Sequence, residues 1–202
     1  KKAAIYMVSA WAQQNSLVLG QVKVDAKSNE ITAIPKLLSR LDIAGAVVTI
    51  DAMGCQKKIA QQIKQQGGDY VLSLKSNQGN LHDDVATYFT SSLAPAVATV
   101  SYDGEHGRIE TRSLRATADI AWLQERHNWQ GLQSIIAVTA RREIGDKVSE
   151  ETRYFISSLN ADDPQRLERV VRAHWAIENN LHWILDVAFD EDSNRTRNGH
   201  SA

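Results

Sequence analysis

A short apolar segment that ends on a carboxylate constrains this chain more than any other feature. Residues 47–50 form a run rich in β-branched side chains, and Asp51 and Gly54 follow at once. Such a run predicts a buried strand of the parallel type, because strands covered on both faces are apolar throughout. In open α/β sheets the functional groups gather beyond the carboxyl ends of strands, so Asp51 is a candidate functional residue. The alternative is that Asp51 caps the helix that follows.

Composition describes an ordinary globular protein. The chain has 202 residues, of which 43% are hydrophobic and 23% charged, enough for one sizeable core with an inserted subdomain. No apolar stretch approaches the length of a membrane span and no signal peptide is visible, so we expect no membrane partner. With one cysteine the chain cannot form an internal disulfide, which indicates a reducing cytoplasm. The single cysteine, Cys55, has no paired base nearby, and we interpret it as a small buried residue. The net charge of −1 is unusual for a nucleic-acid-binding protein but does not exclude one.

The first half of the chain alternates between strand and helix patterns. Residues 4–12 and 17–24 predict an antiparallel hairpin. A helix should follow, with Pro35 near its start and an apolar face made by Ile34, Leu37, Leu38 and Leu41. After the Asp51 strand we expect a helix at about 55–66, a strand at 69–75 and a helix at roughly 80–91. This order predicts a layered α/β domain with a mixed sheet.

Residues 97–160 predict a β-rich region, either an insertion between two α/β portions or an extension of the first sheet. The segments 101–114, 134–143 and 148–159 alternate like antiparallel strands, with a short helix near 122–126. In the first segment, His106, Arg108, Glu110 and Arg112 recur at spacing two and would share one strand face. Arginines on such a face could contact DNA phosphates. A solvated outer strand would show the same pattern.

The longest predicted helix covers about 163–188, with Asp163 at its N-cap and Pro164 in its first turn. Its buried stripe consists of Leu167, Val170, Val171, Ile177, Leu181, Ile184, Leu185 and Ala188. Beside the stripe runs a polar ridge at spacing four, formed by His174, Glu178, His182 and Asp186. Glu178 thus lies at the edge of the core, where a carboxylate needs a partner. The ridge is either a set of surface pairs or a group that faces Asp51 and shares a cation with it.

The chemistry of these carboxylates favours a hard divalent cation. Asp51 and Glu178 supply oxygen ligands, which suit Mg²⁺ or Mn²⁺ and not zinc. Two such ions about 3.5–4 Å apart activate a water and stabilise the leaving oxygen in phosphodiester cleavage. That chemistry usually takes three carboxylates, and the sequence places two. An alternative is a transition-metal site made by His174, Glu178 and His182, although side chains four residues apart drift about 40° around a helix.

Four segments, in order along nearly the whole chain, carry a specific resemblance to one family. They are 48–56 (VTIDAMGCQ), 67–78 (GGDYVLSLKSNQ), 106–112 (HGRIETR) and 174–187 (HWAIENNLHWILDV). With these segments the chain resembles DDE transposases, in particular the bacterial insertion-sequence subgroup that includes the H-repeat-associated proteins. The resemblance implies metal-dependent cleavage of element-end DNA and strand transfer into target DNA, with two Mg²⁺ or Mn²⁺ ions. It also implies double-stranded DNA as partner, a homo-oligomer and a cytoplasmic, nucleoid-associated location.

The resemblance further implies a ribonuclease H-like α/β fold, with a mixed sheet, flanking helices and a β-rich insertion before the last catalytic helix. Its parts would be 1–96 (first part of the core), 97–160 (insertion) and 161–202 (C-terminal catalytic helix and tail). By motif match, Asp51 and Glu178 would be the second and third catalytic acids and the metal ligands. Candidate DNA contacts are Lys75, Asn77, Arg108 and Arg112. Residues that would contact the metal ligands, and not the metal itself, are His174, Asn179 and His182.

The chain departs from the family pattern in its first catalytic acid. That Asp belongs on a strand before residue 4, and neither Asp25 nor Asp42 has the context to replace it. We therefore expect a catalytically incomplete piece of a longer protein, in which two inner sheet edges lack a partner. Such a piece would pair with another copy, close the gap by shifting strands, or be poorly stable. The rival hypothesis is a remnant that binds DNA or protein and cuts nothing.

A second departure surrounds Glu178. Many relatives in the broader insertion-sequence group carry Tyr, Arg and Lys near the glutamate, where this chain has Val171, His174 and Leu185. The roles of those auxiliary residues therefore pass to neighbours or are lost.

Overall fold

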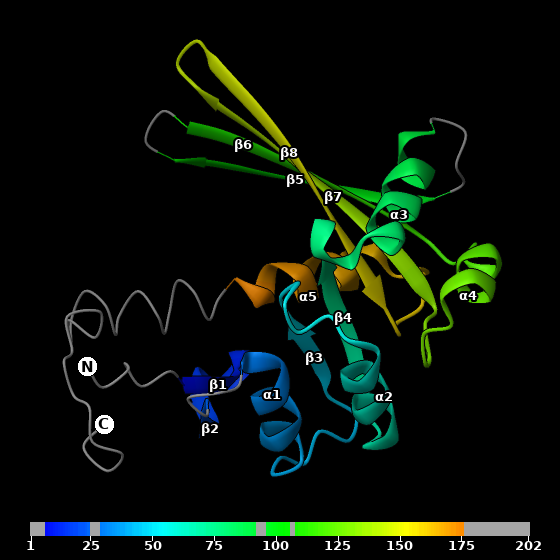
Figure 1. The fold of residues 1–202 in the computed structure, drawn as a ribbon. Helices are drawn as coiled ribbons and strands as arrows, with labels where there is room; N and C mark the ends of the chain where they lie inside the picture. The colour runs from blue at the N-terminus through cyan, green and yellow to red at the C-terminus, as the bar shows by residue number, and fades with distance from the viewer. Residues whose placement is uncertain (1–6, 25–28, 92–95, 106–107, 176–202) are drawn as a thin grey trace, which may run out of the picture.

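The computed structural model describes residues 7–24, 29–91, 96–105 and 108–175. At its centre is a six-stranded mixed sheet with the strand order β3-β4-β8-β7-β6-β5 (Figure 1). Its strands are β3 (Val47–Ile50), β4 (Asp69–Leu74), β5 (Val97–Glu105), β6 (Arg108–Thr117), β7 (Ser134–Ile144) and β8 (Lys147–Ser157). Strands β3 and β4 are parallel, and the other neighbours pair antiparallel. The mixed α/β architecture is therefore confirmed.

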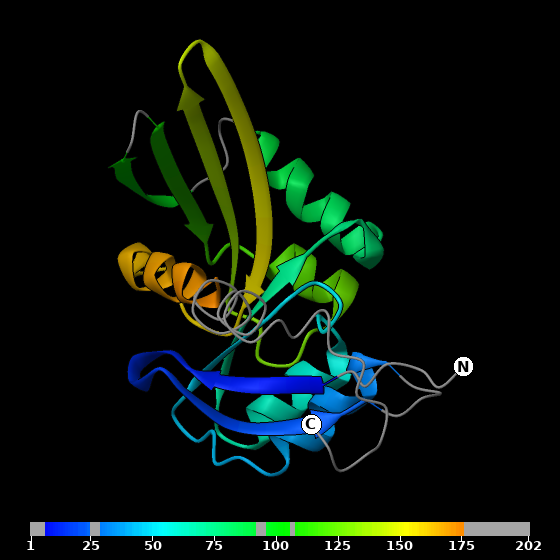
Figure 2. The same cartoon turned by 90° about the vertical axis from the view of Figure 1, so that its left-hand side faces the viewer.

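Helices cover both faces of this sheet. The described helices are α1 (Glu30–Leu38), α2 (Lys57–Gln65), α3 (Asn80–Thr90), α4 (Ala121–His127) and α5 (Pro164–His174). The apolar side chains of α2, α3 and α4 join one core with one face of the sheet, and those of α5 join a second core on the other face. Figure 2 shows α5 on one side of the sheet and α3 and α4 on the opposite side.

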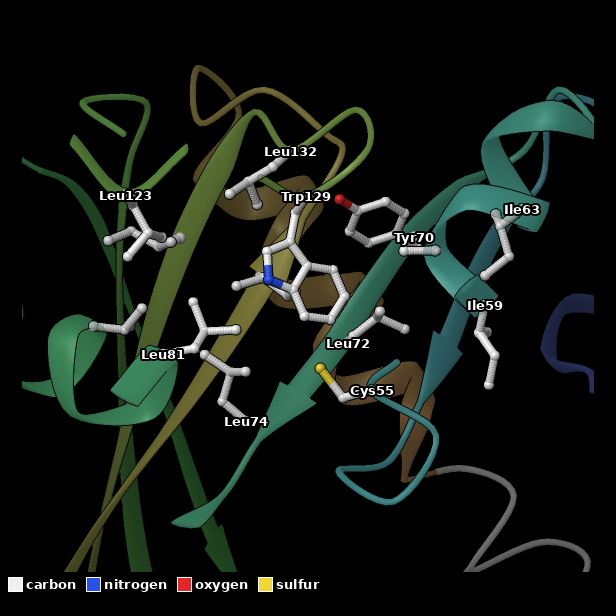
Figure 3. Packing of buried hydrophobic residues seen from close by; sticks show 14 of the residues in the cluster. Cys55, Ile59, Ile63, Tyr70, Leu72, Leu74, Leu81, Leu123, Trp129 and Leu132 are labelled. Carbon is white, nitrogen blue, oxygen red and sulfur yellow. The ribbon is translucent and has the colours of Figure 1, made fainter. Parts of the chain in front are cut away.

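The alternation of β4 explains why two cores form. Tyr70 and Leu72 point into the core beneath α2, and Val71 between them points to the α5 side. Figure 3 shows the indole of Trp129 packed among the larger core, with Cys55 and Leu72 nearby. Because the buried residues come from segments on both sides of residue 97, the two halves of the chain share one core. Strand β8 pairs with β4, so the later strands extend the first sheet.

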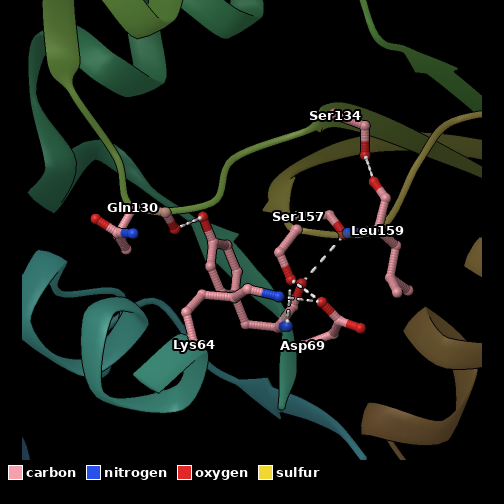
Figure 4. A network of polar contacts seen from close by, with 8 residues as sticks. Lys64, Asp69, Gln130, Ser134, Ser157 and Leu159 are labelled. Atoms are coloured by element: carbon pink, nitrogen blue, oxygen red, sulfur yellow. Dashed lines mark hydrogen bonds and ion pairs between the residues drawn. The ribbon is translucent and has the colours of Figure 1, made fainter. Parts of the chain in front are cut away.

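A polar network closes the start of β4 (Figure 4). Asp69 Oδ1 accepts hydrogen bonds from Lys64 Nζ at 2.6 Å and from Ser158 Oγ at 2.8 Å. Ser158 Oγ in turn accepts the backbone N–H of Tyr70, at 2.9 Å. Partial burial by itself raises the pKa of Asp69, but the bonds from Lys64 and Ser158 outweigh it and leave this pKa below its ordinary value. The network thus joins α2, β4 and the residues after β8.

The N-terminal hairpin forms a sheet of its own. Strand β1 (Met7–Ala12) pairs antiparallel with β2 (Leu17–Lys23), as predicted, around the short 3₁₀ turn η1 (Gln13–Asn15). Val22 packs against Ala33 and Leu37 of α1, so the hairpin rests on that helix. Within the described residues, no hydrogen-bonded ladder joins the hairpin to β3. The expected closure of the gap by shifted strands is therefore not seen in this part of the chain.

Two local predictions were wrong. The segment 101–114 is not one strand, because the chain reverses within it to form the hairpin of β5 and β6. Helix α1 begins at Glu30, so Pro35 lies in its interior and not near its start. The N-terminal parts of α5 agree with the prediction: Asp163 caps the helix by accepting the N–H of Arg166 at 2.8 Å, and Pro164 follows. The rest of that predicted helix, to residue 188, lies outside the described residues.

None of the described helices has the length and apolar character needed to cross a membrane.

Candidate active site at the end of β3

Strand β3 lies at an edge of the six-stranded sheet and delivers Asp51 to its carboxyl end. Val48 and Ile50 pack against the larger core, and Val47 packs on the α5 side. All four strand residues are partly exposed, so the prediction of a fully buried strand was wrong. The parallel pairing with β4 is as predicted, and it places Asp51 and the turn after β4 at the same edge of the sheet.

Asp51 organises a tight turn. Its Oδ1 accepts the backbone N–H groups of Met53 and Gly54, each at 3.2 Å. The following helix, α2, has Gln56 as its N-cap residue, so the alternative that Asp51 caps this helix was wrong. The carboxylate is exposed. Because both bonds use one oxygen, the turn fixes the direction of a carboxylate that is open to a ligand.

A second turn supports the first. Asn77 lies in η2 (Ser76–Gln78), directly after β4, and its Nδ2 donates a hydrogen bond to the carbonyl of Ala52 at 3.0 Å. Gln78 Nε2 donates to the same carbonyl at 3.4 Å. Asn77 was predicted as a DNA contact, and the structure gives it a contact within the chain. Gln78 was missed, although it stands in the segment that carried the family resemblance.

The end of α5 reaches β3 two residues before Asp51. His174 Nδ1 lies 3.2 Å from Thr49 Oγ1, within hydrogen-bond distance. The His174 ring also meets the edge of Trp175, with 5.4 Å between ring centroids. The Trp175 ring in turn packs under the guanidinium of Arg153 on β8, at 4.3 Å. His174, predicted as a supporting residue, is therefore anchored on β3 at Thr49, two residues before Asp51 in the sequence. Thr49 was missed, because a threonine in a strand carries no signal of its own.

The other predicted site residues of the catalytic helix, Glu178, Asn179 and His182, lie outside the described residues. Among the residues that are described, no group of three or more His, Cys, Asp or Glu side chains could hold a metal ion. Asp51 is the described candidate ligand. Its exposed carboxylate is a hard oxygen donor, so in chemical kind it fits Mg²⁺ or Mn²⁺.

The face of β6 that carries Glu110 and Arg112 takes part in contacts within the protein. Glu110 is only 4% exposed and pairs with Arg112 at 2.6 Å and with Arg142 of β7 at 3.3 Å. This face points to the α5 side of the sheet, where Leu114 is buried with Leu167, so the alternative of a solvated outer strand was wrong. Arg112 thus neutralises a buried carboxylate. Arg108 begins β6, but its side chain, like His106, lies outside the described part.

Two residues from the sequence analysis remain, the candidate DNA contact Lys75 and the cysteine Cys55. Lys75 is exposed and follows the end of β4. The hydrogen bond from Arg153 is the main cause that lowers the pKa of Glu151 on β8, and the positive charge of Lys75 adds a small part. Cys55 is fully buried behind the Asp51 turn. Burial raises the pKa of its thiol to about 12, and the nearby Asp51 carboxylate adds to the rise. A thiol with this pKa is not a nucleophile at neutral pH, which confirms the interpretation of Cys55 as a small buried residue.

Comparison with known proteins identifies the family of the chain. The family model for the transposase DDE domain matches residues 1–202. The chain belongs to this DDE transposase family. It is 43% identical over 210 residues to “Putative transposase YncI” of Escherichia coli O157:H7, an alignment that covers 100% of the chain and 53% of that protein.

Two other relatives indicate the subgroup of DDE transposases to which the chain is similar. It is 40% identical over 211 residues to “H repeat-associated putative transposase YhhI” of E. coli K12, covering 100% of the chain and 55% of that protein. It is also 49% identical over 123 residues to “H repeat-associated putative transposase YbfD” of the same strain, covering 59% of the chain and 48% of that protein. The resemblance to the H-repeat-associated subgroup is thus confirmed. The chain spans about half the length of these curated relatives.

Proposed function

We propose that this chain is part of the catalytic core of a DNA transposase. The complete enzyme would cut element-end DNA and transfer the free strand into target DNA. In this proposal the mixed sheet and its flanking helices form a ribonuclease H-like core. Asp51 and Glu178 hold two divalent cations, Mg²⁺ or Mn²⁺, together with a carboxylate from elsewhere in the complete protein. Acting on chromosomal DNA would place the protein at the bacterial nucleoid, as a homo-oligomer that brings two element ends together.

The observation that carries the proposal is the contact between α5 and β3. His174, the last residue of α5, meets Thr49 of β3 at 3.2 Å, and Asp51 follows Thr49 by two residues. Val47 lies on the face of β3 that α5 covers. Side chains two residues apart in a strand point to the same face, so the pattern predicts Thr49 and Asp51 on the α5 side as well. Glu178 follows His174 by four residues, about one helical turn if the helix continues as its sequence predicts. The two acids would then converge at one end of β3.

The two acids, His174 and the turn after Asp51 have different roles in the proposed reaction. Asp51 and Glu178 would supply the carboxylates that hold the divalent ions. When bound, the divalent ions would supply a lowered pKa for the attacking water or 3′-hydroxyl and charge stabilisation for the leaving oxygen. His174 would keep the helix that bears Glu178 on β3. The backbone N–H groups of Met53 and Gly54 hold Asp51 Oδ1 and so fix the direction of the carboxylate.

The test is nicking of element-end DNA by the complete protein that carries this sequence. Nicking should require Mg²⁺ or Mn²⁺. Asp51→Asn and Glu178→Gln should each lower its rate by more than about 10²-fold, the scale for losing one preorganised charge contact. DNA affinity should stay nearly unchanged. Asp51→Asn keeps an oxygen that can accept the two N–H groups of the turn, so its unfolding midpoint should match that of the wild type.

The chain offers a matched control for the first variant. Asp42 is also exposed and also accepts a backbone N–H in a turn, from Ala44 at 3.2 Å, but it precedes β3 at the opposite end of the strand. Asp42→Asn should therefore nick DNA at the wild-type rate. Undiminished nicking by Asp51→Asn would remove this carboxylate from the mechanism. A complete protein that binds element ends but never nicks them would favour the rival hypothesis of a binding remnant.

A further inference from the structure

The peptide unit between Ala52 and Met53 is held at both of its ends. Its carbonyl accepts hydrogen bonds from Asn77 Nδ2 at 3.0 Å and from Gln78 Nε2 at 3.4 Å. Its N–H donates to Asp51 Oδ1 at 3.2 Å. A peptide unit is planar and trans, so its carbonyl and its N–H point in opposite directions. Whatever fixes the carbonyl therefore also aims the N–H at the carboxylate.

The surroundings of this peptide leave its carbonyl few alternatives. Ala52 is 3% exposed, and an unpaired carbonyl at such a position costs free energy. Asn77 itself lies on the surface, in the turn after β4, so its amide can be removed without opening the core. Hydrogen bonds in series also polarise one another, and the pull on the carbonyl makes the N–H a better donor to Asp51.

We propose that Asn77 and Gln78 are positioning residues that orient the Asp51 carboxylate through the Ala52–Met53 peptide. The inference rests on the proposed function, because it gives Asp51 a task for which its direction matters. Without these side chains the peptide can rotate, its N–H turns away, and the carboxylate loses one of the two bonds from the turn. A displacement of about 1 Å at a reacting group can cost up to about 10²-fold in rate.

The competing role for Asn77 is the one that the sequence indicated, a contact to DNA. The two roles predict different kinetics. A positioning residue changes kcat and leaves KM for DNA nearly unchanged, whereas a phosphate contact changes DNA affinity and its dependence on salt. They also differ without DNA, because only the positioning role affects the N–H of Met53 in the free protein.

The experiment compares Asn77→Ala, Gln78→Ala and the double variant with wild type, in the complete protein. Two quantities are measured: the exchange rate of the Met53 amide hydrogen without DNA, and kcat and KM for Mg²⁺-dependent nicking. Asn77→Ala should raise the exchange rate about five- to tenfold, on the scale of one lost hydrogen bond, and lower kcat about tenfold. Gln78→Ala should have a smaller effect, because its bond is longer, and the double variant the largest. KM for DNA should change less than about twofold.

Asn80 supplies the matched control. It is exposed in the same turn region, at the start of α3, and makes no hydrogen bond to the described residues through its side chain. Asn80→Ala should leave the amide exchange, kcat and KM at their wild-type values. Asn80→Ala should also unfold at the wild-type midpoint. The Asn77 and Gln78 variants should stay folded with a midpoint lowered by only a few degrees, because the altered side chains lie at or near the surface and one carbonyl loses its partners.

Three results would overturn the proposal. Unchanged exchange of the Met53 amide in the double variant would show that the two side chains do not hold the peptide. Faster exchange with unchanged kcat would show that the held peptide does not serve catalysis. A raised KM with normal kcat and exchange would make Asn77 a DNA contact. If the wild-type protein does not nick DNA at all, the proposed function fails, and the exchange rates alone still decide whether the two side chains orient the turn.

Discussion

Gly54 closes the Asp51 turn at a place where no side chain fits. A Cβ added to Gly54 would overlap Ile50 Cγ2 and lie 2.8 Å from Ile34 Cδ1. The Ile34 methyl group is the far end of a flexible side chain and can rotate away. Ile50 Cγ2 has much less freedom, because it is bonded directly to the Cβ of a β-branched residue whose χ1 rotation is restricted. Gly54→Ala should therefore push the turn away from the end of β3.

The size of the effect follows from two opposing contributions. Overpacking a well-filled site costs about 1–3 kcal/mol. Replacing glycine by alanine returns about 0.4–1 kcal/mol, because the unfolded chain loses freedom. The net loss in unfolding free energy should be about 1–2 kcal/mol, or a fall in Tm of about 2–8 °C for a chain of this size. Because Gly54 also donates its N–H to Asp51 Oδ1, nicking of DNA should fall with it.

Thermal unfolding followed by circular dichroism measures this difference, with Gly20→Ala as control. A Cβ on Gly20 in β2 would meet only the ends of two leucine side chains, Leu37 Cδ1 at 3.3 Å and Leu41 Cδ2 at 3.8 Å. Gly20→Ala should leave Tm unchanged or raise it. If Gly54→Ala were as stable as Gly20→Ala and kept full nicking activity, the close packing of the turn on Ile50 would not matter for the site, and the reasoning would be wrong.

Two other predictions concern titratable groups. The pKa of Asp69 is lower in the folded than in the unfolded protein, so its contribution to stability is full above the unfolded value of about 3.9 and is lost as the pH falls through the folded value. Asp69→Asn should thus lower the unfolding free energy at pH 7, and urea titrations should show this gap to wild type narrowing below about pH 4; an equal gap at pH 3 would contradict the assignment. The thiol of Cys55, buried and with a pKa raised to about 12, should not react with a disulfide reagent at pH 8 until urea unfolds the protein, whereas rapid reaction in the native state would show that the turn opens.

Local sequence patterns were enough to predict the strands and the helix around Asp51. The apolar runs of β3 and β4 and the helix α2 between them are bounded by glycines and polar turns, and all three form where the pattern indicates. Gly67, which ends the α2 region, has φ of +77°, a conformation that favours glycine. These elements depend on neighbours in sequence, which is why periodicity alone finds them.

The face of β6 shows where such patterns fail. Glu110 and Arg112 alternate as a solvated strand would, yet Glu110 is 4% exposed. Its burial is possible only because Arg142, from a different strand, and Arg112 both approach it. Burial of that kind depends on which strand becomes the neighbour. The hairpin of β5 and β6 was missed for a related reason, since the alternation of polar and apolar residues continues through both strands and concealed the reversal.

The candidate site depends on contacts of the same long range. Thr49 and His174 are 125 residues apart in sequence, and their contact anchors the end of α5 on β3, the strand that leads to Asp51. Asn77 approaches the Asp51 turn from another direction, from the end of β4. The Asp51 carboxylate is therefore oriented by its own turn, while the end of α5 is anchored independently on β3. For the proposed function, separate supports for the Asp51 turn and for the end of α5 suit a site that must fix the distance between two ligands, because neither support has to move when the other binds its ligand.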